Sequence, residues 1–364
     1  TGGQFMPPIM GAAAFIMAEI IGIPYYQVAL GALIPALIYY GAVFAIVHFR
    51  AKTDGLSGTD TSELPSLGHM MLKKGIMFAP LIILIFFLVI VRISVMKAAV
   101  YSVIAAILIG IIVSRTTLKG FIDAFVDAAR TALVVITSTA TAGIVVAIIN
   151  LTGLGMKFSN LMINAAGDYL ILVLFLMMVG SLILGMGLPT TPAYLILAVL
   201  GAPTLIGLGV EPLAAHMFVF YFGCISMITP PVALAVYAAT TIAKSNFWKT
   251  AYESVLLGLC AFIVPYMFVY SPELLGKGEW HEVIIAGATG ILGAVSLGAG
   301  IAGWLLVRAK WYERMILVIA GLLLIVPEGM TNIVGILGII TVILMQRSRK
   351  NIKTDLSHNQ GQTI

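Results

Sequence analysis

Two proline pairs mark the residues of this chain that are best placed to carry chemistry. Pro7 and Pro8 follow the letters GGQFM, and Pro230 and Pro231 follow SMIT, so the pair returns at an offset of 223 residues (230 minus 7). Proline stops a helix from re-forming, and the backbone that it frees is tolerated at membrane depth only where it faces protein or a wet cavity. Broken helices in matching positions of two halves are therefore typical of a transporter's binding site.

The breaks supply groups that bind small ions. An unwound backbone offers carbonyl oxygens to a hard monovalent cation, and a helix N-terminus offers unpaired N–H groups to a carboxylate. Thr229 adds a hydroxyl oxygen, and Ser226 lies three residues earlier, where its carbonyl can join the same shell. Such oxygens suit sodium. Glu19 lies near the end of a short apolar run, and because buried acids in membranes are usually functional, proton coupling remains an alternative to sodium coupling. The loop Gly22-Ile23-Pro24 lies close to Glu19, so an acid at the membrane interface fits the sequence equally well.

A third break lies between these pairs, in the sequence GMGLPTTP that starts at Gly185. Its glycines allow positive φ angles and close approach, and its threonines carry hydroxyl groups for a substrate or an ion. We expect this break to face the Pro-Pro breaks. The predicted substrate-binding residues are Gly185, Gly187, Pro189, Thr190 and Thr191.

The composition places these breaks in a membrane protein. Apolar residues make up 61% of the 364 residues and charged residues only 10%, against roughly 25% in an ordinary soluble domain. The formal charge of +5 comes from Lys and Arg in short loops between apolar runs, which is the pattern of membrane topology, so we expect no nucleic-acid partner. Cys224 and Cys260 lie inside apolar segments without ligand spacing and are expected to be core thiols.

The apolar runs predict how the breaks are positioned. Ile9–Ile23 is shorter than the ~20 residues that cross a bilayer, so it is predicted as one limb of a re-entrant hairpin. The order of break, short limb, polar loop and span occurs twice. We predict five regions. Residues 1–50 hold the end of a first hairpin and a span, residues 51–74 form a polar loop, and residues 75–184 hold membrane helices that lead into a second repeat. Residues 185–275 hold the second hairpin and its span, and residues 276–364 hold C-terminal membrane helices and a polar tail.

A count of basic residues predicts that the two copies are inverted. If each span crosses once, twelve Lys and Arg residues share one face and four lie on the other, so the first face is predicted to be cytoplasmic. The loops after the two short limbs then fall on opposite sides, as inverted repeats require. The first face holds Arg50, Lys52, Lys73, Lys74, Arg115, Lys119, Arg130, Lys244, Lys249, Arg308, Lys310 and Arg314, and the second holds Arg92, Lys97, Lys157 and Lys277.

Three motifs together resemble a known family: GMGLPTTPAY from Gly185, ITPPVA from Ile228, and GQFMPPIMG from Gly3. They are similar to the large membrane subunit of tripartite ATP-independent periplasmic (TRAP) transporters, and most similar to the fused permeases that work with TAXI-type solute-binding proteins. Residues 1–275 resemble the latter part of that subunit, and the tail around Trp311–Arg314 resembles the C-terminal extension of the fused form. Because the chain opens directly into a broken helix without an initiator Met, we expect an N-terminally truncated piece of a longer polypeptide.

The resemblance implies an elevator-type carrier in the bacterial inner membrane, a multi-pass protein and not an enzyme. It implies that a periplasmic binding protein delivers a small carboxylate and that a small permease subunit or its fused equivalent takes part. It also implies that sodium or the proton is the coupling ion and that the protein uses no cofactor. It also implies sodium ligands at the second break, from Ser226, Thr229 and the Val232 carbonyl. The pseudo-symmetric positions Gly3, Met6 and Ile9 offer backbone oxygens only.

Three function classes compete for this sequence. A channel would need a filter-like repeat, and an intramembrane enzyme would need an acid pair, a Ser/His pair or a metal motif inside the spans; neither pattern stands out. The histidines are scattered without a partner at i+3 or i+4. The leading prediction is an all-α polytopic carrier with inverted repeats and re-entrant helical hairpins, and the alternative is an ion-coupled anion carrier of another family with the same kind of repeats.

Overall fold

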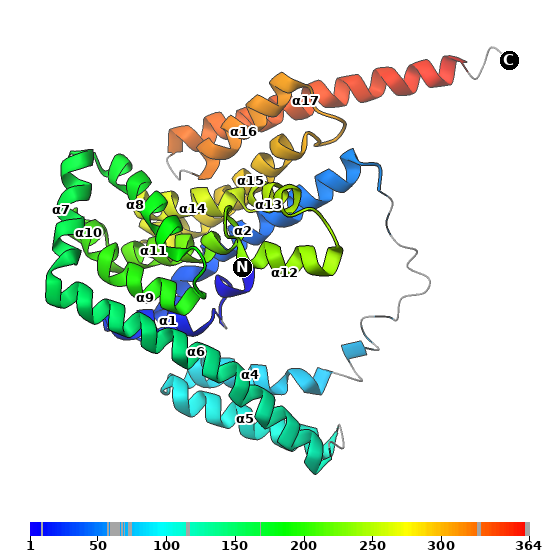
Figure 1. Ribbon diagram of the computed structural model, residues 1–364. Helices are drawn as coiled ribbons and strands as arrows, with labels where there is room; N and C mark the ends of the chain where they lie inside the picture. The colour runs from blue at the N-terminus through cyan, green and yellow to red at the C-terminus, as the bar shows by residue number, and fades with distance from the viewer. Residues whose placement is uncertain are drawn as a thin grey trace.

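The computed structural model consists of helices joined by turns and short breaks, as the apolar runs predict (Figure 1). Within the residues that the structure describes, seven helical segments are long and apolar enough to cross a membrane: Tyr25–Thr53, Val95–Ile112, Leu118–Thr152, Thr190–Gly207, Phe247–Tyr270, Trp280–Ala302 and Gly329–Arg349. The structure describes residues 1–8, 10–56, 58, 66, 68, 70–71, 75–113, 117–167, 169–325 and 329–360, with side chains as far as Arg349. Most of the predicted polar loop 51–74 therefore lies outside the described residues.

The first break leads into a short helix and then a long one. A 3-10 turn, η1 (Gly2–Gln4), precedes the proline pair, and α1 (Ala12–Ile21) follows it. Gly22 closes α1 with a φ of +76°, a left-handed conformation that favours glycine. The span α2 (Tyr25–Thr53) then runs through the centre of the molecule (Figure 1). Helix α1 has ten residues and lies within the predicted short limb Ile9–Ile23, and the re-entrant hairpin itself stays a prediction.

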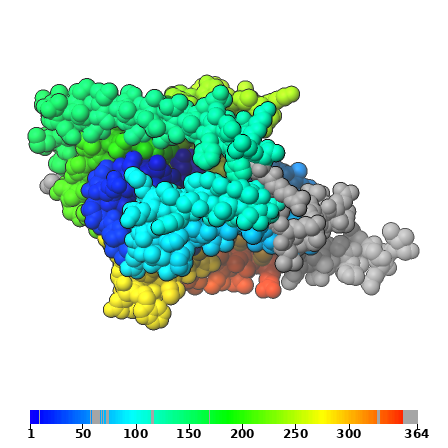
Figure 2. Space-filling view, turned by 90° about the horizontal axis from the view of Figure 1, so that it is seen from below, coloured from blue at the N-terminus to red at the C-terminus, as the bar shows by residue number. Residues whose placement is uncertain are grey.

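The next helices form a hairpin and a long crossing helix. The first arm of the hairpin consists of η3 (Gly75–Phe78), α4 (Ala79–Ile85) and the π-helical η4 (Phe86–Val91), and the second arm is α5 (Val95–Ile112). Figure 2 shows this hairpin, in cyan, beside the blue residues of the N-terminal helices. Helix α6 (Leu118–Thr152) packs along α9 (Figure 1).

The second half contains the other two breaks. It runs through α7 (Leu154–Ala166), α8 (Leu170–Gly185), α9 (Thr190–Leu200), α10 (Ala202–Gly207), α11 (Pro212–Ile225), the 3-10 turn η5 (Ser226–Ile228), α12 (Leu234–Ala243), α13 (Phe247–Leu257), α14 (Leu259–Tyr270) and η6 (Pro272–Leu275). Every residue of α11 from Leu213 to Ile225 is buried, because α8, α9 and α14 pack around it. Helix α11 is therefore the centre of the core.

The helices on either side of the second and third breaks pack in different ways. Helices α8 and α9 pack against each other across the turn that contains Gly187, whose φ of +77° permits the reversal. Beyond the second proline pair, α12 instead continues away from α11 and packs on η5 and α13 (Figure 1). The proline pair lies in the non-helical segment between η5 and α12, and its place at a re-entrant hairpin tip stays a prediction.

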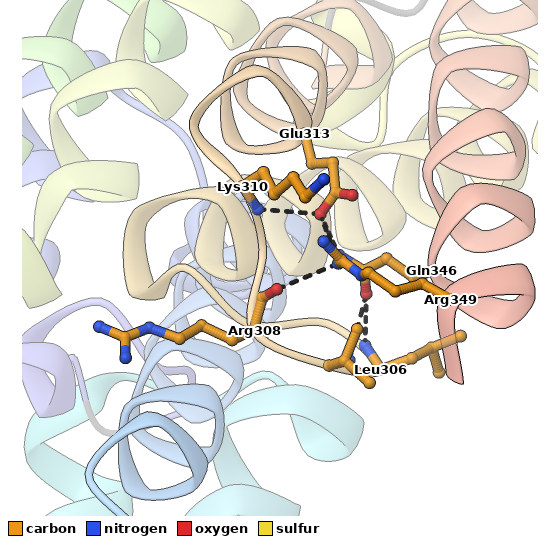
Figure 3. A network of polar contacts seen from close by, with 7 residues as sticks. Leu306, Arg308, Lys310, Glu313, Gln346 and Arg349 are labelled. Carbon is orange, nitrogen blue, oxygen red and sulfur yellow. Dashed lines mark hydrogen bonds and ion pairs between the residues drawn. The ribbon is translucent and has the colours of Figure 1, made fainter. Parts of the chain in front are cut away.

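The C-terminal helices form a separate layer on α2. Helix α15 (Trp280–Ala302) packs on α2 and on α16 (Trp311–Ile325), and α17 (Gly329–Gln360) packs on α16. The buried carboxylate of Glu313 accepts hydrogen bonds from the Lys310 N–H (2.9 Å), the Gln346 amide (2.9 Å) and the Arg349 guanidinium (3.0 Å) (Figure 3). This network joins the α15–α16 loop to α17.

Candidate functional site

The two Pro-Pro breaks share one local conformation. Each begins with a three-residue 3-10 turn, η1 or η5, and each proline pair is joined by a cis peptide bond. Each then passes through a non-glycine residue with positive φ, Met10 at +46° and Ala233 at +43°, a region that such residues rarely occupy. Ten-residue helices follow in both copies. The offset is 223 residues within the breaks but 222 between the helix starts (234 minus 12), so the first copy has one residue more.

Three side chains bring the three breaks into contact. The Thr190 hydroxyl donates to Oε1 of Gln4 (2.8 Å), and its oxygen lies 3.3 Å from the Met227 sulfur. The Gln4 amide nitrogen lies 3.9 Å from the same sulfur. Gln4 and Met227 occupy equivalent positions of the two proline motifs, and Thr190 starts α9 after the third break. The structure thus assembles the breaks around one point.

The glycines of the third break fit tightly against the second one. A Cβ atom on Gly185 would lie 2.7 Å from the Ser226 hydroxyl, and one on Gly187 would lie 3.7 Å from the Val232 side chain. The first distance is shorter than real Cβ contacts. Gly185 is therefore required for the approach of α8 to η5, whereas Gly187 is at an ordinary contact distance from Val232.

A cavity of about 200 Å³ opens beside this meeting point. Its walls come from the first turns of α1 and α9, from Met10 and Gly11, and from the middle of α6. The helices' N-caps are Gly11 and Pro189, which carry no side-chain acceptor, so the first N–H groups of both helices are left for a ligand. The lining residues are Gln4, Met10, Gly11, Ala12, Ala13, Val134, Val135, Ser138, Pro189, Thr190, Thr191 and Pro192.

The predicted substrate residues divide between this cavity and the packing interface. Pro189, Thr190 and Thr191 line the cavity, whereas Gly185 and Gly187 lie against the second break. Two helix N-termini that meet at one cavity give it a positive potential without a charged side chain among its lining residues. The arrangement can hold an anionic group, such as a carboxylate, by backbone N–H groups and threonine hydroxyls.

The predicted cation ligands of the second break lie in one turn. The Ser226 hydroxyl donates to the Gly223 carbonyl (2.7 Å), and the Thr229 hydroxyl donates to the Ile225 carbonyl (2.9 Å). Each hydroxyl uses its proton in this way and keeps oxygen lone pairs for a cation. The Ser226 carbonyl already accepts from the Thr229 N–H (3.2 Å), which leaves it one further lone pair. Val232 lies beyond the proline pair and is half-buried.

The first break offers fewer ligands. Gly3 belongs to η1, and the Met6 carbonyl accepts a hydrogen bond from the Met10 N–H (3.3 Å). Ile9, the third predicted ligand here, lies outside the described residues. The Tyr25 hydroxyl at the start of α2 donates to the Pro8 carbonyl, and this bond ties the break to the following span.

Sequence reasoning missed several residues of the site. Gln4 and Met227 were detectable as the equivalent residues of the repeated motif, and Ser138 lies in the Thr-, Ser-, Ala- and Gly-rich part of α6, a composition that suits a polar path. The buried His216 has no partner at i+3 or i+4, but its Nδ1 lies 2.8 Å from the Tyr194 hydroxyl. The two are 22 residues apart, on α9 and α11, a separation that no helical spacing rule detects.

Comparison with known proteins adds one match. The family model described as "Tripartite ATP-independent periplasmic transporter, DctM component" matches residues 1–278, which include all three breaks. A search of curated proteins found no match to this chain.

Proposed function

Since this chain belongs to the DctM component family of tripartite ATP-independent periplasmic transporters, we propose that its breaks form the sites for a small carboxylate and for the coupling cation. Members of this family are multi-pass permeases of the inner membrane and not enzymes. They are secondary transporters that take up solute with a periplasmic binding protein, and a cation gradient drives them. The proposal therefore concerns which solute class is carried and which residues hold it.

The cavity beside Thr190 supports a carboxylate substrate. Ala12, Ala13, Thr190 and Thr191 present first-turn N–H groups there, and the side-chain hydroxyls of the two threonines add further polar groups. No Lys or Arg is among the described residues that line the cavity, so recognition rests on oriented dipoles, which are weaker than a full charge and allow release. A volume of about 200 Å³ suits a small organic acid.

The second break supports a sodium site next to this cavity. Ser226 and Thr229 supply hydroxyl and carbonyl oxygens within one turn, and the Val232 carbonyl completes the proposed shell. Gly3, Met6 and Ile9 form the proposed second, backbone-only shell at the first break. Gly185 links the cation shell of the second break to the α8–α9 turn, because that glycine lies directly against Ser226. Cation binding would thus fix the turn that begins α9 and so order the substrate cavity.

The proposed mechanism is alternating access of an elevator kind, with two inverted repeats around the site. The matched break conformations and the ten-residue helices after them support the repeat, and the contact of α8 with α9 supports a re-entrant hairpin at the third break. We further infer a fused, TAXI-associated permease, because α15 packs on α2 and carries α16 and α17 as an additional layer beyond the matched residues. The small permease subunit, or its fused equivalent, would then be part of the same assembly.

The observation that carries the proposal is the joint approach of the uncapped α1 and α9 N-termini to one cavity. The full-length protein, reconstituted with its binding protein, is expected to accumulate a labelled carboxylate when a sodium gradient is imposed. Uptake of a matched neutral analogue should be absent. If uptake follows a pH gradient in the absence of sodium, the coupling ion is the proton and not sodium. If only the neutral analogue is taken up, the carboxylate site is refuted.

A further inference from the structure

A second, larger cavity lies apart from the three breaks, where two membrane spans begin. Its volume is about 870 Å³. It is enclosed by the end of α1, the start of α2, the end of η4 and the start of α5. Figure 2 shows these segments side by side, in blue and cyan. Because α2 and α5 are both candidate spans, a cavity at their N-terminal ends lies at a surface of the membrane.

The cavity combines an apolar floor with two opposite charges. Phe15, Leu88 and Val95 supply apolar surface, and Glu19 and Arg92 lie exposed on its lining. Among the described residues, neither charged group has an ion-pair partner. The acid and the base therefore share a cavity with their charges available to a ligand.

The base is held in position. Arg92 ends η4 with a φ of +59°, and its guanidinium lies 4.2 Å from the ring centroid of Tyr26 at the start of α2. Stacking of this kind fixes the plane of the guanidinium and leaves its edge N–H groups for an oxyanion. Glu19 lies on the α1 side of the same cavity, so the cavity presents a positive group on one wall and a negative group on another.

We propose that this cavity binds the headgroup of phosphatidylethanolamine, with the lipid phosphate on Arg92, the lipid ammonium on Glu19 and an acyl chain along the apolar floor. A primary ammonium can donate hydrogen bonds to a carboxylate, which a choline group cannot do. Phosphatidylglycerol has the phosphate but no cation for Glu19. The cavity would therefore select among phospholipids by the amine.

Native mass spectrometry of the full-length protein in detergent tests this selectivity. The probes are dioleoyl phosphatidylethanolamine, phosphatidylcholine and phosphatidylglycerol, each added separately. The wild type should bind the ethanolamine lipid most tightly, and Glu19→Gln and Arg92→Gln should each raise its apparent Kd about tenfold, the loss of one charge-assisted contact. Lys97→Gln removes a nearby exposed cation that does not line the cavity, and it should leave the apparent Kd for the ethanolamine lipid unchanged.

A further variant guards against misfolding as an explanation. Ala99→Phe fills the cavity from α5 without changing a charge, and it should weaken binding of the ethanolamine lipid while elution and thermal unfolding stay as in the wild type. Equal binding of all three lipids by the wild type would overturn the proposal, as would wild-type affinity in both charge variants. A third outcome would also overturn the proposal: Arg92→Gln weakens binding of the glycerol lipid as much as binding of the ethanolamine lipid, and Glu19→Gln has no effect. The cavity would then bind an anionic headgroup and would not recognise the ammonium group.

Discussion

The amide nitrogen of Gln4 lies 3.9 Å from the sulfur of Met227, although the two residues are 223 positions apart in the chain. They are the same position of the repeated proline motif, so the two copies meet through corresponding side chains. Thr190 contacts both of them and connects this meeting point to the start of α9. The ligands proposed for the cation and the substrate surround this small polar cluster.

Thr229→Ala is expected to weaken the cation dependence of uptake more than substrate capture. Loss of one hydroxyl ligand from a shell otherwise made of carbonyls costs about 1–3 kcal/mol, or about ten- to a hundredfold in affinity. Thr229→Ser keeps the oxygen and should retain most function. The half-saturating sodium concentration in proteoliposome uptake checks this, and wild-type values in both variants would place the cation elsewhere.

Gly185→Ala is expected to disturb the site without adding a charge or removing a ligand. The new methyl would lie 2.7 Å from the Ser226 hydroxyl, so α8 and η5 must separate, at a cost of about 1–3 kcal/mol. Gly207→Ala in α10, where the added Cβ meets no atom within 4 Å, is the control. Thermal unfolding and uptake are measured together, and equal behaviour of the two variants would show that the close contact has no role.

Gln4 and Thr190 should be energetically coupled. Thr190→Val removes the donor and keeps the shape, whereas Gln4→Leu removes the acceptor. A double-mutant cycle on substrate affinity should give a coupling of about 0.5–1.5 kcal/mol, the net value of one hydrogen bond. Strict additivity of the two changes would mean that the 2.8 Å contact does not contribute to the substrate-binding state.

The Glu313 network should make stability depend on pH. Burial raises the pKa of this carboxyl, but hydrogen bonds from the Lys310 N–H and from the Gln346 and Arg349 side chains, with the Arg349 charge, outweigh burial and hold the pKa below its ordinary value. A lowered pKa stabilises the fold above the unfolded pKa of about 4.3, and this stability is lost as pH falls through the folded pKa. Glu313 lies outside the candidate spans.

Thermal unfolding in detergent between neutral and acidic pH measures this effect. Glu313→Gln should lower the midpoint temperature of unfolding at neutral pH. It should also abolish the part of the acid-induced loss of stability that this carboxyl causes, so the midpoint temperatures of the wild type and the variant should approach each other as the pH falls. Asp123→Asn, at an exposed acid that has no ion-pair partner among the described residues, serves as the control. Parallel curves for the wild type and Glu313→Gln would contradict the lowered pKa.

Cysteine labelling tests the predicted orientation of the chain. An impermeant reagent added from outside should fail at Ser245→Cys and at Ser57→Cys, which lies outside the described residues, and it should react at Ser94→Cys on the opposite predicted face. The native thiols of Cys224 and Cys260 are fully buried and should give no background. Labelling at Ser245→Cys together with protection at Ser94→Cys would reverse the topology.

The sequence predicts the helices well because hydropathy and proline placement are local signals. The apolar runs of the sequence predict helices at Ile9–Ile23, Ala98–Ser114, Leu170–Leu184 and Val232–Ala243. The bounds of α1, α5, α8 and α12 agree with these runs to within a few residues. The proline pattern does not reveal which break reverses the chain, because that depends on packing: α8 returns against α9, whereas α12 leaves α11. For the same reason, the pairing of Tyr194 with His216 and the contribution of Ser138 required the folded structure.

The one extra residue in the first copy has a geometric consequence. Gly11 lies between Met10 and the start of α1, whereas Ala233 leads directly into α12. One residue corresponds to about 100° of rotation around a helix axis. The two ten-residue helices therefore turn different faces toward their own breaks, and an exact twofold relation is lost at this point. Gly11 and the helix start that it shifts are part of the lining of the small cavity, so this one additional glycine makes the two proline breaks chemically unequal.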